Sequence, residues 1–242
     1  MKQKYYKYLI LLFILLIIIP SLQVSAQDSD DVDKQVWLDW VSYRLPSENF
    51  QFMGDAGFRF LVGGGWEKYL VRPSLQKGIN EWLDLFGGLG FFYTVQKGLS
   101  NTLEIRPWIG ARVYWYWDTF RKLRFSDYFR IEDRFIINTQ SSGTSNSIRL
   151  RNKIDARIPI TNQYFVDDLL YAMLSFEFFI DGGDVKELFA DKIRLGVGLG
   201  YKFNYNWRVE FNFYGFRSQG TTTSEFTVTD QVWRLTLKHY ID

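Results

Sequence analysis

The chain has 242 residues, of which 19% are aromatic and 23% are charged, and it contains no cysteine. Its formal net charge is +2, but residues 1–26 hold three lysines and no acidic residue, so the rest of the chain carries a charge of −1. This balance excludes the basic surface of a nucleic-acid-binding protein, and the lack of cysteine excludes disulfides, thiolate metal sites and a lipidated N-terminal cysteine.

Residues 1–26 have the layout of a secretory signal peptide. Three lysines precede an apolar run over residues 9–19, and a short polar stretch ends at Ala26. The alternative is a membrane-anchoring helix, but this run is well short of the roughly 20 apolar residues that span a bilayer. We therefore expect cleavage after Ala26, a flexible acidic N-terminus at residues 27–34, and a single β-barrel domain at residues 35–242.

Beyond the signal, apolar and polar residues alternate with a period of two, which is typical of β-strands with one apolar face. In one such segment Leu103, Ile105 and Ile109 share a face, while Glu104 and Arg106 lie on the other. The predicted strands are residues 35–45, 50–61, 68–76, 81–95, 101–117, 124–138, 147–160, 168–181, 190–204, 206–218 and 226–241.

Long alternating strands in an exported chain without cysteine favour an all-β fold, a transmembrane antiparallel up-and-down β-barrel, over a soluble sandwich or barrel. In lipid every backbone polar group must be paired, so spanning strands have to close on themselves. Eleven segments are present, whereas single-chain bacterial barrels have an even number of strands, so we predict 10–12 strands and favour twelve. The expected location is the outer membrane of a Gram-negative bacterium, with outer-membrane lipids and the barrel-insertion machinery as partners.

The face that alternation assigns to the lumen carries more basic than acidic residues. The segment RLRNKIDARIPI at residues 149–160 shows this most clearly, with a charge at almost every second position. Matching opposite charges on neighbouring strands predicts a register for each hairpin. The predicted opposed pairs are Glu104 with Arg134, Arg106 with Glu132, Glu132 with Lys153, Arg130 with Asp155, and Arg151 with Glu177. With Arg149, Arg157 and Arg194, these residues form the predicted charge network of the lumen.

Two local features depart from plain alternation. Strict alternation sends Asp133 toward lipid, so we expect a β-bulge or a register change near it. Gly196, Gly198 and Gly200 superficially resemble a phosphate-binding loop, but no helix follows them and they share one strand face. We expect these glycines to make room for long arginine side chains of neighbouring strands.

The sequence assembles no catalytic group, so we expect neither an enzyme nor a cofactor. His239 is the only histidine, and it lies on the apolar face of the last predicted strand, where an interfacial role is expected rather than a catalytic one. The acidic segment at residues 28–33 lacks the glycine and the terminal glutamate of a calcium-binding loop. We therefore expect no metal site.

Five stretches resemble a known family. They are FRIEDRF (129–135), RLRNKIDARIPI (149–160), EFFID (177–181), RLGVGLGYKF (194–203) and LTLKHYI (235–241). They look like domain-of-unknown-function family 2490, which comprises exported outer-membrane-type β-barrel proteins common in Bacteroidetes. The resemblance covers nearly the whole chain after the signal and implies a barrel, but it supplies no activity and no binding residue.

Two functions of different class are compatible with these features. The first is a narrow, porin-like channel lined by arginine and favouring small anions. The second is a closed structural barrel, filled by its charge network, that acts as an envelope anchor or partner subunit. A soluble periplasmic barrel is a weaker alternative.

Overall fold

The structure is a computed structural model that describes residues 32–47, 50–115, 123–161, 166–182, 193–219 and 226–241. The predicted signal peptide and residues 27–31 of the predicted acidic N-terminus lie outside these residues. No described helix is long and apolar enough to cross a membrane. The strands are β1 (Asp33–Ser47), β2 (Phe50–Leu61), β3 (Trp66–Asn80), β4 (Leu83–Gln96), β5 (Thr102–Trp115), β6 (Arg124–Asn138), β7 (Thr144–Pro159), β8 (Leu169–Gly182), β9 (Ile193–Lys202), β10 (Trp207–Gln219) and β11 (Phe226–Ile241).

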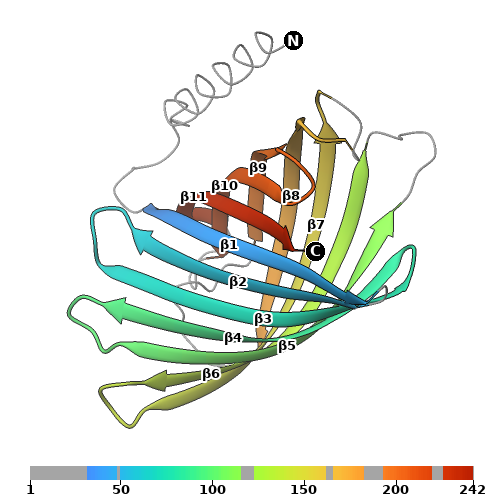
Figure 1. Cartoon of the computed structure of the whole chain (residues 1–242). Helices are drawn as coiled ribbons and strands as arrows, with labels where there is room; N and C mark the ends of the chain where they lie inside the picture. The colour runs from blue at the N-terminus through green and yellow to red at the C-terminus, as the bar shows by residue number, and fades with distance from the viewer. Residues whose placement is uncertain are drawn as a thin grey trace. The chain divides into compact units, whose positions relative to one another are not determined.

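These strands form one closed barrel, in which each strand pairs antiparallel with the next one in the chain (Figure 1). The ring closes where β1 pairs with β11 in parallel. The predicted β-barrel fold is therefore confirmed, and each predicted strand corresponds to one observed strand. Eleven strands fall within the predicted range of 10–12, but the favoured number of twelve is wrong for the described chain. One parallel pairing is the reason, because only a fully antiparallel ring requires an even number.

The parallel pairing between β1 and β11 places the start of the first strand and the end of the last strand at opposite rims of the barrel. Trp37 is aligned with Arg234, Leu38 with Leu235, and the first residue of β1 with Asp230 near the start of β11. Because both strands run in the same direction, β1 starts at the rim from which β11 also starts, and β11 ends at the other rim.

Alternation separates the two faces of the sheet. In β5, Ile109 is 65% exposed on the outside, whereas its neighbour Trp108 is only 7% exposed on the inside. The same division holds around the ring, and the exposed outer face is rich in large apolar side chains. Examples from strands around the ring are Trp40, Phe52, Val71, Phe91, Ile131, Ile154, Leu174, Val197 and Leu235.

Three consecutive glycines make the tight connection between β2 and β3. Gly63, Gly64 and Gly65 have φ angles of 94°, 89° and 116°, which side chains other than glycine rarely adopt. The amide of Gly64 donates a hydrogen bond of 3.0 Å to the carbonyl of Leu61, which closes the turn. The sequence Gly-Gly-Gly is therefore what allows the chain to reverse here.

Asp133 faces outward, and the bulge predicted near it is wrong. The β6–β7 register runs without a shift, and Asp133 lies opposite the exposed Ile148. The β5–β6 register keeps the same offset on both sides of Pro107, which has no amide to donate. The Oδ1 atom of Asp133 is buried and has no hydrogen-bond partner among the described residues. A second outward acid, Asp127, accepts a hydrogen bond of 2.5 Å from Asn152.

Candidate functional site

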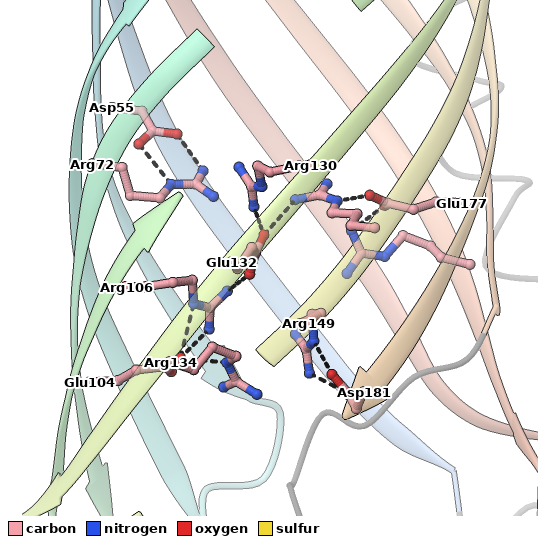
Figure 2. Close-up of polar contacts among 12 residues, drawn as sticks. Asp55, Arg72, Glu104, Arg106, Arg130, Glu132, Arg134, Arg149, Glu177 and Asp181 are labelled. Atoms are coloured by element: carbon pink, nitrogen blue, oxygen red, sulfur yellow. Dashed lines mark hydrogen bonds and ion pairs between the residues drawn. The ribbon is translucent and has the colours of Figure 1, made fainter. Parts of the chain in front are cut away.

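Inward-facing charges from β5, β6 and β7 meet in the interior of the barrel (Figure 2). Glu132 on β6 is almost fully buried, with a side chain 1% exposed. It forms ion pairs with Arg130 on its own strand and with Arg106 on β5, where Nη1 lies 2.9 Å from Oε2. Arg151 on β7 approaches the other carboxylate oxygen at 3.9 Å. One buried carboxylate is therefore shared by three guanidinium groups.

Glu104 on β5 continues this network. Its Oε1 atom accepts hydrogen bonds of 2.6 Å from Nη2 of Arg106 and 2.6 Å from Nε of Arg134. Arg106 consequently bridges Glu104 and Glu132. Charge-assisted hydrogen bonds of this kind are about twice as strong as neutral ones, so they hold these long side chains in place.

Glu177 on β8 extends the network toward β9. Its side chain is fully buried; it pairs with Arg151, and its Oε2 atom lies 2.9 Å from Nη1 of Arg194. At the end of β8, Asp181 accepts two hydrogen bonds from Arg149, of 2.6 Å and 3.3 Å. Ion pairs between arginines and carboxylates thus connect β7, β8 and β9.

The opposite wall, formed by β1, β2, β3 and β11, carries its own arginines. Arg72 binds Asp55 through two hydrogen bonds, and Nε of Arg234 donates to Asp39 at 2.5 Å. Arg59 stacks on the ring of Trp37, with its Cζ atom 3.8 Å from the ring centre. Cation–π contact of this kind is favourable where water is excluded.

These walls enclose a cavity of about 100 Å³, which we call the arginine chamber. Of its fifteen lining residues ten are basic, four are aromatic, and one, Glu132, is acidic. The basic residues are Arg59, Lys68, Arg72, Arg106, Arg130, Arg134, Arg149, Arg151, Arg194 and Arg234, and the aromatic ones are Trp37, Phe92, Phe179 and Phe216. The chamber is therefore strongly cationic.

Aromatic rings contact guanidinium groups that also pair with carboxylates. The Cζ atom of Arg194 lies 4.3 Å from the ring centre of Phe216 and 5.2 Å from that of Phe179. Arg106 lies 4.3 Å from the ring centre of Phe92. The rings hold these arginine side chains without adding negative charge to the chamber.

A second polar cluster lies apart from the chamber. Glu210 on β10 accepts hydrogen bonds of 2.8 Å from the Tyr171 hydroxyl and 2.7 Å from Nζ of Lys238, and Arg157 approaches it at 3.8 Å. The Tyr171 ring packs over Gly200, where a Cβ atom would collide with it. The expectation that the β9 glycines make room for arginines is therefore wrong. Tyr171 occupies the space at Gly200, Tyr214 at Gly196 and Asn212 at Gly198.

The structure brings together most of the residues expected from the sequence, but not all of them. Nine lie in or directly against the arginine chamber: Glu104, Arg106, Arg130, Glu132, Arg134, Arg149, Arg151, Glu177 and Arg194. Lys153, Asp155 and Arg157 do not line it; Lys153 pairs with Asp155 at 2.8 Å on its own strand.

None of the five predicted pairs is directly opposed. Three of them, Glu104 with Arg134, Arg106 with Glu132 and Arg151 with Glu177, form ion pairs between residues displaced by two positions. The other two pairs are wrong. Lys153 lies opposite Tyr128 rather than Glu132, and Asp155 lies opposite Ser126 rather than Arg130. The reason is the register of the β6–β7 hairpin, which is displaced by four residues from the one that charge matching predicts. β6 ends at Asn138 as predicted, but β7 already begins at Thr144 and extends further into the Ser/Thr/Gly segment than expected.

Several chamber residues were not identified from the sequence. Lys68 shares the face of Arg72, so strict alternation along β3 would have found it. Asp181 shares the face of Glu177 at the end of the predicted strand 168–181, so the same alternation would have found it. The aromatic side chains carry no comparable signal, because aromatic residues occur on both faces of this sheet. Alternation along the predicted strand 190–204 also assigns Lys192 to the inner face, but Lys192 lies outside the described residues.

A family model matches most of the chain. The model of the family described as protein of unknown function, DUF2490, matches residues 34–227, which include ten of the eleven strands and all the chamber residues except Arg234. A search of curated proteins found no match.

Proposed function

The chain belongs to the DUF2490 family of proteins of unknown function, and from its geometry we propose that it is an outer-membrane β-barrel that admits small anions into an arginine-lined lumen. The observation that carries this proposal is the inversion of polarity across one closed sheet. Apolar side chains are exposed outside, and charged side chains are buried inside.

The outer face supports the membrane part of the proposal. Soluble monomers rarely expose contiguous apolar surface beyond a few hundred Å². Here large apolar side chains such as Ile109, Phe129 and Val197 are about half exposed or more around the ring. A hydrocarbon solvent would cover this surface, and the closed ring leaves no unpaired sheet edge in lipid.

The inner face supports the anion part. Basic side chains dominate the chamber, and a cation-rich passage with low-dielectric walls concentrates anions and repels cations. The chamber has a volume of only about 100 Å³, so the proposed solutes are small.

Fractionation and bilayer recording test this proposal together. Cells expressing the full chain should yield the protein in the outer-membrane fraction, and boiling should change its gel mobility as the barrel opens. The purified protein should then give small, discrete current steps in planar bilayers. Recovery in the soluble periplasmic fraction, or a correctly folded barrel without current, would contradict it.

A second candidate function is a closed structural barrel. The observation that favours it is the filling of the lumen, because Glu132 and Glu177 are among the largest fully buried side chains and the chamber is only about 100 Å³. Such a barrel would anchor or support a partner in the envelope. It predicts no current and a stoichiometric partner in material purified from outer membranes.

A further inference from the structure

Basic residues outnumber acidic residues by ten to one in the lining of the arginine chamber. Carboxylates of the described residues form ion pairs with several of these cations, among them Asp39, Asp55, Glu104, Glu132, Glu177 and Asp181. The ten basic residues nevertheless concentrate positive charge in a confined space. Buried positive charge is costly, and a bound anion would lower that cost.

Two arginines have hydrogen-bond donors to offer such an anion. The Nε atoms of Arg59 and Arg130 are buried and have no hydrogen-bond partner among the described residues. Arg59 also has no carboxylate within ion-pair distance in the described part of the chain, since its guanidinium stacks on Trp37. Buried donors of this kind normally find a partner, so these two point to a ligand that completes the site.

The shape and size of the chamber limit the class of ligand. Guanidinium groups are planar forks that match the oxygens of carboxylate, phosphate or sulfate two at a time. A volume of about 100 Å³ accommodates a small oxyanion with a few waters but not a nucleotide or a sugar phosphate. A lining of ten basic residues and one acidic residue favours an anion with more than one negative charge.

We propose that the arginine chamber is a saturable binding site for a small oxyanion that carries two negative charges, of which phosphate and sulfate are examples. This inference deepens the proposed function and rests on it, because the anion reaches the chamber through the lumen. Permeation and binding are nevertheless separate properties, and they can be measured separately.

Titration calorimetry of the full barrel in detergent tests the site. Phosphate and sulfate, added at constant ionic strength, should each bind in a saturable manner with about one ion per barrel, whereas chloride should not. The Arg59→Gln variant should bind phosphate about tenfold more weakly or worse, since a hydrogen bond to a charged group is lost. Heat-modifiable gel mobility shows whether each variant is folded.

Arg208→Gln is the matched control. Arg208 also faces the lumen, stacks on a ring (Tyr240, 4.4 Å) and has a buried Nε atom without a described partner, but it does not line the chamber. Its phosphate affinity should equal that of the parent. If Arg59→Gln fails to fold, Arg59→Lys can replace it. Lysine keeps the positive charge but lacks the planar guanidinium group, so this variant should still bind phosphate more weakly than the Arg208→Gln control.

The outcomes separate the two proposals. A barrel that conducts anions but shows no saturable phosphate or sulfate binding overturns this inference and leaves the proposed function intact. A barrel that binds phosphate but passes no current contradicts the channel and supports the chamber. Equal losses of affinity in Arg59→Gln and Arg208→Gln would overturn the assignment of the site to the chamber.

Discussion

Nη1 of Arg106 lies 2.9 Å from Oε2 of Glu132, although the strand register places Trp108, and not Arg106, directly opposite Glu132. The ion pair is diagonal across β5 and β6. Two further pairs, Arg134 with Glu104 and Arg151 with Glu177, are also displaced by two residues from direct opposition. Long side chains reach diagonal neighbours on one face of a sheet, so the network links strands along a slanted path.

Removing the shared carboxylate should destabilise the barrel. Glu132→Gln keeps the shape of the side chain but removes the negative charge that Arg130, Arg106 and Arg151 share. Breaking a buried ion pair in this way lowers the free energy of unfolding by about 3 kcal/mol or more. Urea unfolding of the barrel in lipid vesicles, followed by gel mobility, measures this loss. Glu81→Gln, at an exposed turn position, should change stability by about 0.5 kcal/mol or less. Equal effects of both substitutions would refute the buried network.

Cysteine pairs on the outer face can establish the β5–β6 register in this cysteine-free chain. Ile109 is directly opposite Ile131, so Ile109→Cys with Ile131→Cys should form a disulfide on mild oxidation. The register predicted by direct charge matching would instead place Phe129 opposite Ile109. Preferential oxidation of the 109–129 pair would therefore contradict the observed register.

Gly200→Val should disturb the Glu210 cluster. A side chain at Gly200 collides with the ring of Tyr171, whose hydroxyl donates to Glu210. We expect a loss of about 1–3 kcal/mol in unfolding free energy, as for other overpacked positions. Gly215→Val is the control, because a Cβ atom there meets nothing within 4 Å. The expectation fails if both valines are tolerated equally.

Asp133→Leu should stabilise the barrel in lipid. The carboxylate faces outward, and its buried Oδ1 atom has no hydrogen-bond partner among the described residues. Its replacement therefore removes a desolvation cost of about 1–2 kcal/mol. Asp127→Leu should give no such gain, because Asn152 would lose its acceptor. Unfolding in vesicles compares the two variants, and a loss of stability in Asp133→Leu would mean that this carboxylate has a partner.

Alternation in the sequence is sufficient to predict the strands and their faces, because apolar side chains lie on the outer face of this sheet and charged side chains on its inner face. Arg106 and Ile109 illustrate this, since their opposite polarity assigns both to the correct side. Register could not be derived in the same way. Opposite charges on neighbouring strands indicate which side chains form ion pairs. An ion pair can form between directly opposed residues or between diagonal neighbours, so the charges do not determine the register. The stagger between strands is determined by closure of the whole barrel.

The sequence does not indicate how the first and last strands pair to close the barrel. Trp37 and Arg234 become neighbours only because β1 and β11 run parallel, and neither strand carries a pattern that distinguishes a parallel from an antiparallel partner. The same limit explains the chamber. Trp37, Phe179 and Phe216 line it from β1, β8 and β10, and their convergence depends on the closed ring rather than on any local motif.

The reversal potential in a planar bilayer under a KCl gradient tests the central claim most directly. If the lumen is an arginine-lined passage for small anions, the current should reverse close to the equilibrium potential of chloride, and the preference should weaken as salt screens the fixed charges. A current that reverses near the potassium potential would contradict the account.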